Sequence, residues 1–337
     1  MSSSAIATLA RTRDLVLPAL REAVERLQDP RMRAVCGYHF GWLDADGQPA
    51  DAFGGKALRP ALAVLSAEAA GADSAVGIAP AIAVELVHNF SLLHDDVMDR
   101  DTERRHRSTG WVVFGDGQAI LGGSAMLVLA IEELLRAGDG GSRCLPSLVD
   151  MVQDLISGQS ADLAMERQPV TDLNEVLRME AGKTAALIAC SSKIGAIAAG
   201  APAQVVDALG GFGYEIGMAF QLVDDVLGIV GDSASTGKSA SSDVRARKRS
   251  APIVAALTSG TSAGERLRDL FADSAPARDE DVALAAKLID EAGGIDWAST
   301  EARRRLDLSL AHLSAVGDGP ATEQFAALAR YVVDRDR

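Results

Sequence analysis

Apolar side chains recur at intervals of three or four residues along much of this chain. One stripe, with spacings of 4, 4, 4, 3 and 4, consists of Ile78, Ile82, Leu86, Phe90, Leu93 and Val97. A second stripe consists of Phe212, Ile216, Phe220, Val223 and Leu227. Because residues three and four apart share one face of an α-helix, both stripes predict long helices with one apolar face. No sustained alternation of apolar and polar residues, the period of a strand, accompanies them.

Clusters of glycine, proline and polar residues separate the helical segments. They fall at residues 44–55, 71–77, 138–142, 200–202, 232–243 and 273–281. Such clusters favour turns, and they divide the chain into about ten helices. No change in composition marks a linker between domains. We therefore expect residues 1–337 to form a single all-α domain, a large helical bundle.

Composition and charge narrow the class of protein. Hydrophobic residues make up 48% of the chain but aromatic residues only 4%, which favours closely packed helices with an aliphatic core. The net charge of −14 argues against a nucleic acid as the main partner, because such a partner requires a basic surface. Any phosphate that this chain binds must be met by local cations or through a metal.

No segment of the sequence predicts membrane insertion or export. The longest apolar run, Ala119–Ile131, is shorter than the roughly 20 residues that cross a bilayer. The N-terminal residues lack the continuous apolar block of a secretory signal. Three widely spaced cysteines, Cys36, Cys144 and Cys190, fit reduced thiols. We therefore expect a cytoplasmic protein without a transmembrane segment.

Two acidic clusters are embedded in the apolar stripes. Asp95, Asp96 and Asp99 occur as DDVMD at the end of the first stripe, and Asp224 and Asp225 occur as FQLVDD in the second. Carboxylates four residues apart on a helix repel each other unless a cation lies between them. Magnesium binds one or two carboxylates and completes its shell with water and phosphate oxygens. If the two helices face each other, the pairs predict a site that binds a diphosphate through several metal ions.

Cationic residues lie near both acidic clusters in the sequence. They are Lys56 and Arg59 in GGKALRP, Arg104 and Arg105 after DDVMD, Lys183 in AGKTAAL and Lys238 in STGK, and His88 precedes DDVMD by two helical turns. Arginine binds phosphate oxygens in pairs and lysine acts as a point charge, so this set is sufficient for two diphosphates. Residues 232–243 are the most loop-like segment, and they form either a solvated connection or a lid that carries Lys238.

These motifs, in this order, resemble the signature of the trans-isoprenyl diphosphate synthases, also called polyprenyl synthetases. The matching segments are GGKALRP, ELVHNFSLLHDDVMD followed by RR, GQSAD at 158–162, GKT at 182–184, FQLVDD and TGK, all within about residues 54–254. The resemblance implies an isoprenoid-synthase bundle with a central cavity. It implies a prenyltransferase that condenses isopentenyl diphosphate with an allylic diphosphate (dimethylallyl, geranyl or farnesyl). It also implies Mg²⁺, three ions per active site, and a homodimer that buries apolar faces, including part of residues 119–135.

The resemblance further implies roles for individual residues. The catalytic set is Asp95, Asp96, Asp99, Asp224, Asp225 and Lys183. Within it the metal ligands are Asp95, Asp99 and Asp224, while Asp96 and Asp225 ligate or orient from just behind. The allylic diphosphate is bound by Arg104, Lys183, Thr184, Gln221 and Lys238. Isopentenyl diphosphate is bound by Lys56, Arg59, His88 and Arg105. Gln159 and Asp162 match an interior polar pair that stabilises positive charge or orients Lys183.

Four residues that precede the first acidic cluster, Leu86, Val87, Phe90 and Ser91, are candidates for setting product length. Phe90 lies five residues before Asp95 and Ser91 four before it. A ring followed by a small side chain resembles the geranylgeranyl diphosphate synthases, which make a twenty-carbon chain. We expect Phe90, with Leu86 and Val87 one turn deeper, to form the floor of the product pocket. Farnesyl or longer products are the alternatives, and Phe90 as ordinary core packing is the other interpretation.

Two positions depart from the family pattern. Gly228 stands where the second motif commonly has a fifth-position acid, and Asp232 is the candidate replacement. Ser124 stands where an aspartate commonly follows glycine, which puts the local polar network in doubt. These departures motivate one alternative, an inactive helical subunit of a heteromeric synthase. A class I terpene cyclase is another, but it needs no second diphosphate site and no second aspartate pair.

Overall fold

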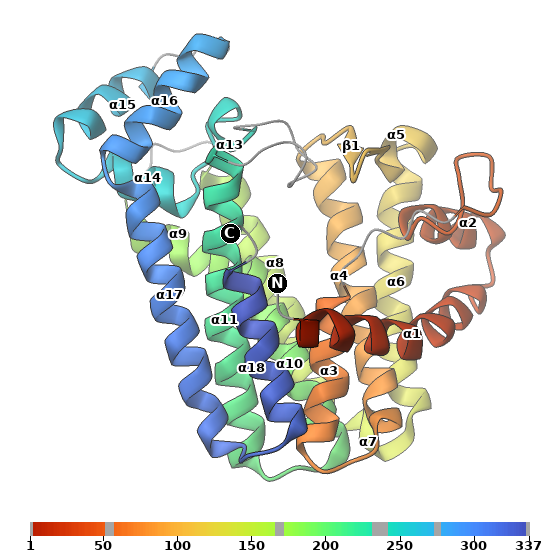
Figure 1. The fold of residues 1–337 in the computed structure, drawn as a ribbon. Coiled ribbons are helices and arrows are strands. Elements are labelled where there is room, and N and C mark those ends of the chain that lie inside the picture. Colours follow the sequence, from red (N-terminus) through yellow and green to blue (C-terminus); the bar gives the residue numbers. More distant parts are fainter. Residues whose placement is uncertain (1–2, 51–56, 166–171, 231–241, 273–277, 335–337) are drawn as a thin grey trace. The chain divides into compact units, whose positions relative to one another are not determined.

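The structure, a computed structural model, describes residues 3–50, 57–165, 172–230, 242–272 and 278–334 (Figure 1). Lys56, Asp232 and Lys238 lie outside the described residues. Within them almost all regular structure is helical, and the two strands have two residues each. The prediction of an all-α fold is therefore confirmed.

The chain divides into two compact units. The first unit comprises residues 1–152, 187–213 and 312–328, and the second comprises residues 153–186, 214–311 and 329–337. Helices α8, α10, α11, α17 and α18 contribute residues to both units. The expectation of a single domain stays a prediction, and each unit is described separately below.

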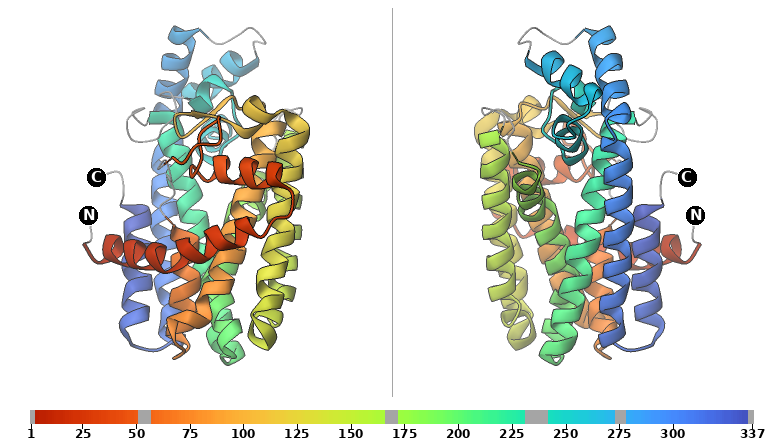
Figure 2. Two further views of the ribbon diagram at one scale, coloured as in Figure 1. Left: turned by 90° about the vertical axis from the view of Figure 1, so that its right-hand side faces the viewer. Right: turned by 90° about the vertical axis from the view of Figure 1, so that its left-hand side faces the viewer.

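The first unit contains the N-terminal helices and the first acidic cluster. Its elements are α1 (Ser3–Glu25), α2 (Pro30–His39), α3 (Leu58–Ala69), η1 (Ser74–Gly77), α4 (Ile78–Met98), β1 (Glu103–Arg104), β2 (Arg107–Ser108), α5 (Gly110–Phe114), α6 (Asp116–Arg136), α7 (Gly138–Ser142), the start of α8 (Leu145–Met165), most of α10 (Ala186–Ala199), the start of α11 (Ala203–Val230), η3 (Leu313–Ala315) and most of α18 (Pro320–Val333). Figure 2 shows α1 lying across α3 and α4.

Helix α4 is the central element of the first unit. Its stripe is buried as predicted, with Ile82, Leu86 and Leu93 at most 2% exposed. Helices α4 and α6 lie side by side (Figure 1). A nitrogen of the His94 ring lies 2.9 Å from the backbone oxygen of Ile120 on α6. Burial of this face fixes the rotation of α4, and so the direction in which its acidic residues point.

The second unit contains the second acidic cluster. Its elements are the end of α8, α9 (Leu173–Glu180), a π-helical turn η2 (Ala181–Ala185), the end of α11, α13 (Ser242–Arg245), α14 (Ala251–Leu257), α15 (Ser262–Ala272), α16 (Asp279–Glu291), α17 (Gly294–His312) and the end of α18. A core that includes Ile229, Ile253, Leu267 and Leu288 joins α11, α14, α15 and α16. Arg305 on α17 donates a hydrogen bond of 2.8 Å to Glu215 on α11.

Two segments of the described residues are long and apolar enough to cross a membrane, judged by length and composition alone. They are Ser74–Met98 and Asp116–Arg136. The most apolar part of the first is largely buried inside the structure, as in a core helix, whereas less than half of the corresponding part of the second is buried. The absence of a transmembrane segment stays a prediction.

Candidate active site

The first acidic cluster ends helix α4. The backbone N–H of Asp99 donates to the backbone oxygen of Asp95 at 2.8 Å, so the two carboxylates lie one turn apart on one face. Asp95 is half-buried and Asp99 is exposed. The C-terminal end of a helix carries partial negative charge, which disfavours further anions there. A bound cation would remove both sources of repulsion, so the donor set fits the Mg²⁺ that the sequence predicts.

Asp96, between these two residues in sequence, is bound by an arginine. It is 1% exposed, and one of its oxygens lies 2.7 Å from Nε and 2.6 Å from Nη2 of Arg104. Burial raises the pKa of Asp96, and the charge of Arg104 opposes that rise. Of the two roles expected for Asp96, this geometry favours orienting over metal ligation, because its carboxylate fixes Arg104.

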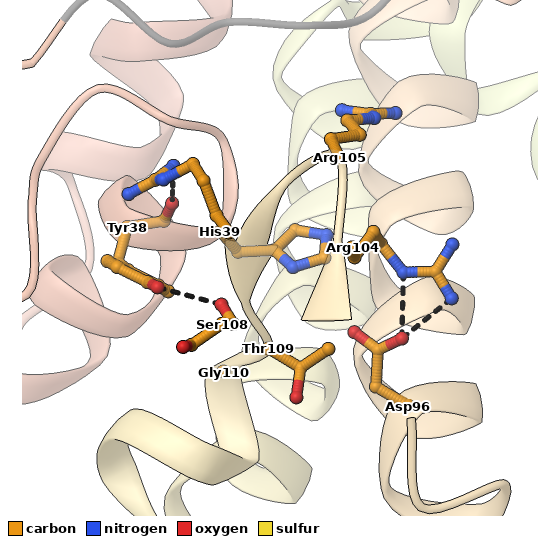
Figure 3. Close-up of a pocket in the computed structure, with 9 residues that line it drawn as sticks. Tyr38, His39, Asp96, Arg104, Arg105, Ser108, Thr109 and Gly110 are labelled. Atoms are coloured by element: carbon orange, nitrogen blue, oxygen red, sulfur yellow. Dashed lines mark hydrogen bonds and ion pairs between the residues drawn. The ribbon is translucent and has the colours of Figure 1, made fainter. Parts of the chain in front are cut away.

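Arg104 and Arg105 lie on a tight β-hairpin. Strands β1 and β2 pair antiparallel with Arg104 opposite Arg107, so Arg105 and His106 form the turn. Both have positive φ, 53° and 60°, as in a type I′ turn, in which glycine or asparagine is usual. The turn directs consecutive arginines differently: Arg104 points toward Asp96, and Arg105 points away from it (Figure 3).

A third arginine anchors this hairpin to helix α2. Arg107 donates hydrogen bonds to the backbone oxygens of Tyr38, at 3.1 Å, and Leu43, at 2.9 Å. Its guanidinium group also lies over the Tyr38 ring, 4.3 Å from the centroid. The Tyr38 hydroxyl donates to the backbone oxygen of Ser108 at 2.7 Å. These contacts hold Arg104 and Arg105 at the C-terminal end of α4.

Two residues expected to bind isopentenyl diphosphate lie together. Arg59 Nη1 is 3.3 Å from His88 Nε2. Burial lowers the pKa of His88 well below its ordinary value, and Arg59, Arg105 and Arg104 lower it further. A neutral imidazole accepts a hydrogen bond from Arg59 at Nε2, so Nδ1 carries the proton. The structure thus groups Arg59, His88 and Arg105 in the first unit, as predicted.

Three buried polar residues in this region were not singled out from the sequence. They are His39 on α2 and Glu85 and Asn89 on α4; the last two lie within the segment ELVHNFSLLHDDVMD, where the family resemblance implied no role for them. Glu85 is 7% exposed and Asn89 is 1% exposed. Buried polar groups at helical spacing beside predicted phosphate ligands were the signal that could have revealed Glu85 and Asn89.

The second acidic cluster is part of a hydrogen-bonded chain in the second unit. Thr184 Oγ1 donates to Gln221 Oε1 at 2.6 Å, and Gln221 Nε2 donates to Asp225 at 2.7 Å. Asp224 is half-buried, whereas Asp225 is 2% exposed. The predicted residues Thr184, Gln221 and Asp225 are therefore brought together. Asp224 is the more accessible of the pair, as a metal ligand must be.

Asp225 shares its buried position with a carboxyl group that the sequence did not reveal. The backbone N–H of Ala251 donates to Glu180, at 3.2 Å, and to Asp225, at 3.3 Å. Burial raises the pKa of Asp225 to about 6, and burial together with the charge of Asp225 raises the pKa of Glu180 well above its ordinary value. The charge of Lys248 opposes both rises. This arrangement favours a proton held between the two carboxyls.

Lys183 forms an ion pair in the second unit. Its Nζ lies 2.5 Å from Asp162, which agrees with the predicted role of Asp162 in orienting Lys183. The lysine belongs to the π-helical turn η2, and Gly158 on α8 packs against the backbone of Lys183 so closely that a Cβ at 158 would overlap it. Gln159 is 6% exposed, and neither atom of its amide has a hydrogen-bond partner among the described residues.

A carboxylate from another helix lies beside Gly228, the position at which the second motif commonly has an acid. A Cβ at Gly228 would overlap the carboxylate of Asp243 on α13. Asp243 therefore places an acidic group beside the fifth position of the second motif, and glycine is needed there for this approach. Asp232, the replacement considered from the sequence, lies outside the described residues. Ser124 is exposed and donates to the backbone oxygen of Ile120 at 3.0 Å, within its own helix.

The four candidate chain-length residues are all buried. Leu86 and Val87 are 0% exposed, Phe90 is 7% and Ser91 is 8% exposed. The Phe90 ring packs edge-on against His94, with centroids 4.9 Å apart, and so faces α6. Ser91 Oγ donates to the backbone oxygen of His88 at 2.8 Å. Their effect on product length stays a prediction.

No three carboxylate, histidine or cysteine side chains of the described residues are grouped closely enough to form a complete metal site. This is compatible with Mg²⁺ held by one or two carboxylates and by substrate oxygens. Asp95 and Asp99 belong to the first unit, and Asp224 and Asp225 to the second. Their convergence on one diphosphate is therefore taken up as part of the proposed function.

Comparison with known proteins agrees with the motif analysis. The polyprenyl synthetase family model matches residues 48–289. A (2E,6E)-farnesyl diphosphate synthase of Mycobacterium tuberculosis (strain ATCC 25618 / H37Rv) is 46% identical over 341 residues, covering 99% of this chain and 94% of that protein. A geranylgeranyl diphosphate synthase of the same strain is 40% identical over 332 residues, covering 98% of this chain and 94% of that protein.

Solved structures show the same similarity. The crystal structure of a polyprenyl synthetase from Streptomyces coelicolor A3(2) matches with a TM-score of 0.92 and 50% sequence identity, covering 97% of this chain and 98% of that chain. The structure of a geranylgeranyl pyrophosphate synthetase from Pyrococcus horikoshii Ot3 matches with a TM-score of 0.87 and 29% identity, covering 98% of each chain.

Proposed function

The chain belongs to the polyprenyl synthetase family and is a trans-isoprenyl diphosphate synthase, and we propose that its main product is geranylgeranyl diphosphate. The observation that supports this product is Phe90 followed by Ser91, both buried on α4 one turn before Asp95. A farnesyl product is the second candidate, because the relative at 46% identity is named a farnesyl diphosphate synthase and the relative at 40% a geranylgeranyl diphosphate synthase.

The two diphosphates are bound by different sets of side chains. Arg59, His88 and Arg105, with Lys56, bind isopentenyl diphosphate, which does not ionise and needs no metal. Arg104, Lys183, Thr184, Gln221 and Lys238 bind the allylic diphosphate. Guanidinium and ammonium groups donate to its oxygens and neutralise the charge that develops on them. Because each diphosphate has its own set of cationic side chains, the two anionic substrates can be bound at the same time despite their mutual repulsion.

The reaction breaks a carbon–oxygen bond of the allylic substrate. The pyrophosphate leaves with the bonding electrons, the double bond of isopentenyl diphosphate forms the new carbon–carbon bond, and loss of a proton restores a double bond. Asp95, Asp99 and Asp224 would hold Mg²⁺, which when bound would supply electrostatic stabilisation of the leaving pyrophosphate. Asp96 holds Arg104 in position, and Asp225 holds Gln221 in position. Asp162 does the same for Lys183.

The carboxylates of the two acidic clusters, together with Asp243, are enough to hold three magnesium ions. Asp95 and Asp99 lie on one face of α4, and Asp224 lies on α11 with Asp243 beside Gly228. Each ion would keep water and diphosphate oxygens in its remaining positions. All five aspartates of the two motifs then have a role, three as ligands and two as orienting groups.

We also propose a cytoplasmic homodimer. Leu121, Val128 and Leu135, spaced seven residues apart on α6, are 55%, 64% and 55% exposed. Such a stripe of large apolar side chains is typical of a surface that another chain covers. Sedimentation velocity of Val128→Glu should give a monomer where the wild-type chain gives a dimer. A dimer that survives this change would place the interface elsewhere.

The proposed activity is tested by product analysis. Purified protein is supplied with Mg²⁺, labelled isopentenyl diphosphate and dimethylallyl, geranyl or farnesyl diphosphate in turn. We expect incorporation with each primer and a twenty-carbon end product. A fifteen-carbon end product from the two shorter primers would establish the farnesyl alternative. Release of hydrocarbon from an allylic diphosphate alone would indicate a terpene cyclase instead.

A further inference from the structure

Helix α4 carries a row of buried polar side chains beside its metal-binding row. Glu85, Asn89 and Asp96 are separated by four and seven residues, so they lie within about 40° of one another around the helix axis. They are 7%, 1% and 1% exposed. Burial of polar groups costs free energy unless each finds a partner, so the row requires specific partners on the elements that it faces.

Each member of this row faces a polar or cationic group. Asp96 pairs with Arg104, as described above. Asn89 Nδ2 donates to Glu85, at 2.8 Å to the backbone oxygen and at 3.1 Å to the carboxylate. Burial raises the pKa of Glu85, while Arg59, the hydrogen bond from Asn89 and Arg105 oppose that rise. Glu85 lies one helical turn before His88, whose Nε2 is 3.3 Å from Arg59 Nη1, so its carboxylate is on the part of α4 that faces Arg59.

His39 on α2 joins the row to the pocket in Figure 3. This pocket is lined by Tyr38, His39, Asp96, Arg104, Arg105, Arg107, Ser108, Thr109 and Gly110. Nε2 of His39 is buried and has no hydrogen-bond partner among the described residues. Burial and the nearby Arg104, Arg105 and Arg107 lower the pKa of His39 to about 3, and a hydrogen bond with Asn89 opposes them. The ring is thus neutral, and Asn89 contacts both His39 and Glu85.

We propose that Glu85, Asn89 and His39 form a positioning layer for Arg59 and Arg105, and that this layer sets the affinity for isopentenyl diphosphate. Two guanidinium groups directed at one small anion repel each other when the anion is absent. A buried carboxylate that interacts with both offsets this repulsion, and the neutral His39 imidazole lies near Arg105 without adding charge. Arg104 has its own carboxylate in Asp96, so the charge of Glu85 acts on the isopentenyl diphosphate side and not on the allylic side. This inference rests on the proposed function.

Removal of the Glu85 charge tests the layer. In Glu85→Gln the side chain keeps its shape, and we expect KM for isopentenyl diphosphate to rise about tenfold, as for loss of one charge-assisted interaction. KM for the allylic diphosphate should change less than about twofold, since Arg104 is unaffected. The matched control is Glu133→Gln, which removes a buried carboxylate of α6 that pairs with Arg26, away from the arginines of the site.

His39→Phe provides a second variant on a different helix. It keeps a ring of similar size but removes both nitrogens, and so it should raise KM for isopentenyl diphosphate selectively even if Glu85→Gln does not fold. Equal rises in both KM values, or an effect no larger than that of Glu133→Gln, would overturn the proposed layer. KM values unchanged in both layer variants would overturn it as well.

A binding measurement separates this inference from the proposed function. Calorimetric titration of isopentenyl diphosphate is carried out in EDTA, where only the metal-independent site binds. Wild-type protein that neither binds nor condenses it would contradict the proposed function itself. Wild-type binding that Glu85→Gln and His39→Phe weaken about tenfold supports the layer, and binding equal in all three proteins contradicts the layer while leaving the function intact.

Discussion

Arg104 donates from Nε and Nη2 to a single oxygen of Asp96, over 2.7 and 2.6 Å. The carboxylate is 1% exposed, and its other oxygen has no hydrogen-bond partner among the described residues. An aspartate in the middle of a metal-binding motif is therefore used to hold an arginine. This divides the motif DDVMD into two carboxylates available to metal and one that organises the diphosphate site.

Asp96→Asn should separate these two roles. The amide cannot hold Arg104 by charge, so we expect KM for the allylic diphosphate to rise about tenfold or more. Mg²⁺ dependence should be preserved, because Asp95 and Asp99 remain. The control is Asp101→Asn, whose more exposed carboxylate is 3.9 Å from the same arginine. Steady-state kinetics with varied allylic substrate makes the comparison, and equal effects of the two changes would contradict the assigned role.

Gly228→Ala tests the approach of Asp243 to α11. The added methyl group overlaps the Asp243 carboxylate, so we expect kcat/KM for the allylic diphosphate to fall about tenfold. Alanine is otherwise the better helix former by about 1 kcal/mol. Gly117→Ala on α6, where a Cβ would meet no atom within 4 Å, is the matched control and should leave activity unchanged. Full activity of Gly228→Ala would show that Asp243 has no part in the site.

The helices and the two acidic clusters could be predicted from the sequence, because apolar periodicity and helical spacing are local properties. The buried stripe through Ile82, Leu86 and Leu93 is an example. The direction of Arg105 could not be predicted, since it depends on positive φ at Arg105 and His106 in a turn without glycine or asparagine. The π-helical turn at Lys183 was missed for a similar reason, because it follows from packing against Gly158.

Contacts between residues that are far apart in the sequence could not be predicted either. Glu180 and Asp225 are 45 residues apart, and Gly228 and Asp243 belong to different helices. Their pairing depends on how helices pack, which no motif spacing encodes. His39 shows the same limit: it was not considered among the candidates, and only the structure places it beside Arg104 and Asn89.

Glu180→Gln should change the pH dependence of stability. In the folded chain the pKa of Asp225 is raised from 3.8 to about 6, and that of Glu180 is raised well above its ordinary value of 4.5. The folded protein therefore keeps protons that the unfolded chain has released, so stability present at low pH is lost as pH rises through these values. Glutamine removes one of the two acids, so the loss of folding stability as pH rises should be smaller than in the wild-type chain.

Urea unfolding in EDTA at several pH values measures this difference. Metal must be absent because ions bound by Asp224 would alter the neighbouring carboxyl groups. Identical slopes of unfolding free energy against pH for the wild-type chain and Glu180→Gln would contradict the shared proton.

Phe90→Ala should lengthen the product. Removal of the buried ring would leave space beside His94 on α4, and if Phe90 limits the product, chains longer than the wild-type product should accumulate. Chromatography of the dephosphorylated products measures their length. Leu284→Ala, at a 38% exposed position on α16, is a control for a large-to-small change outside the site. A product spectrum identical to that of the wild-type chain would assign Phe90 to core packing alone.

In the proposed mechanism, Asp95, Asp99 and Asp224 hold metal ions on one and the same diphosphate. The most direct measurement is anomalous scattering from crystals grown with Mn²⁺ and inorganic pyrophosphate, Mn²⁺ being a substitute for Mg²⁺. We expect metal peaks at ligand distance, about 2.0–2.2 Å, from all three carboxylates, with a single pyrophosphate contacting every ion. Peaks at only one of the two acidic clusters, or a separate pyrophosphate at each, would contradict it.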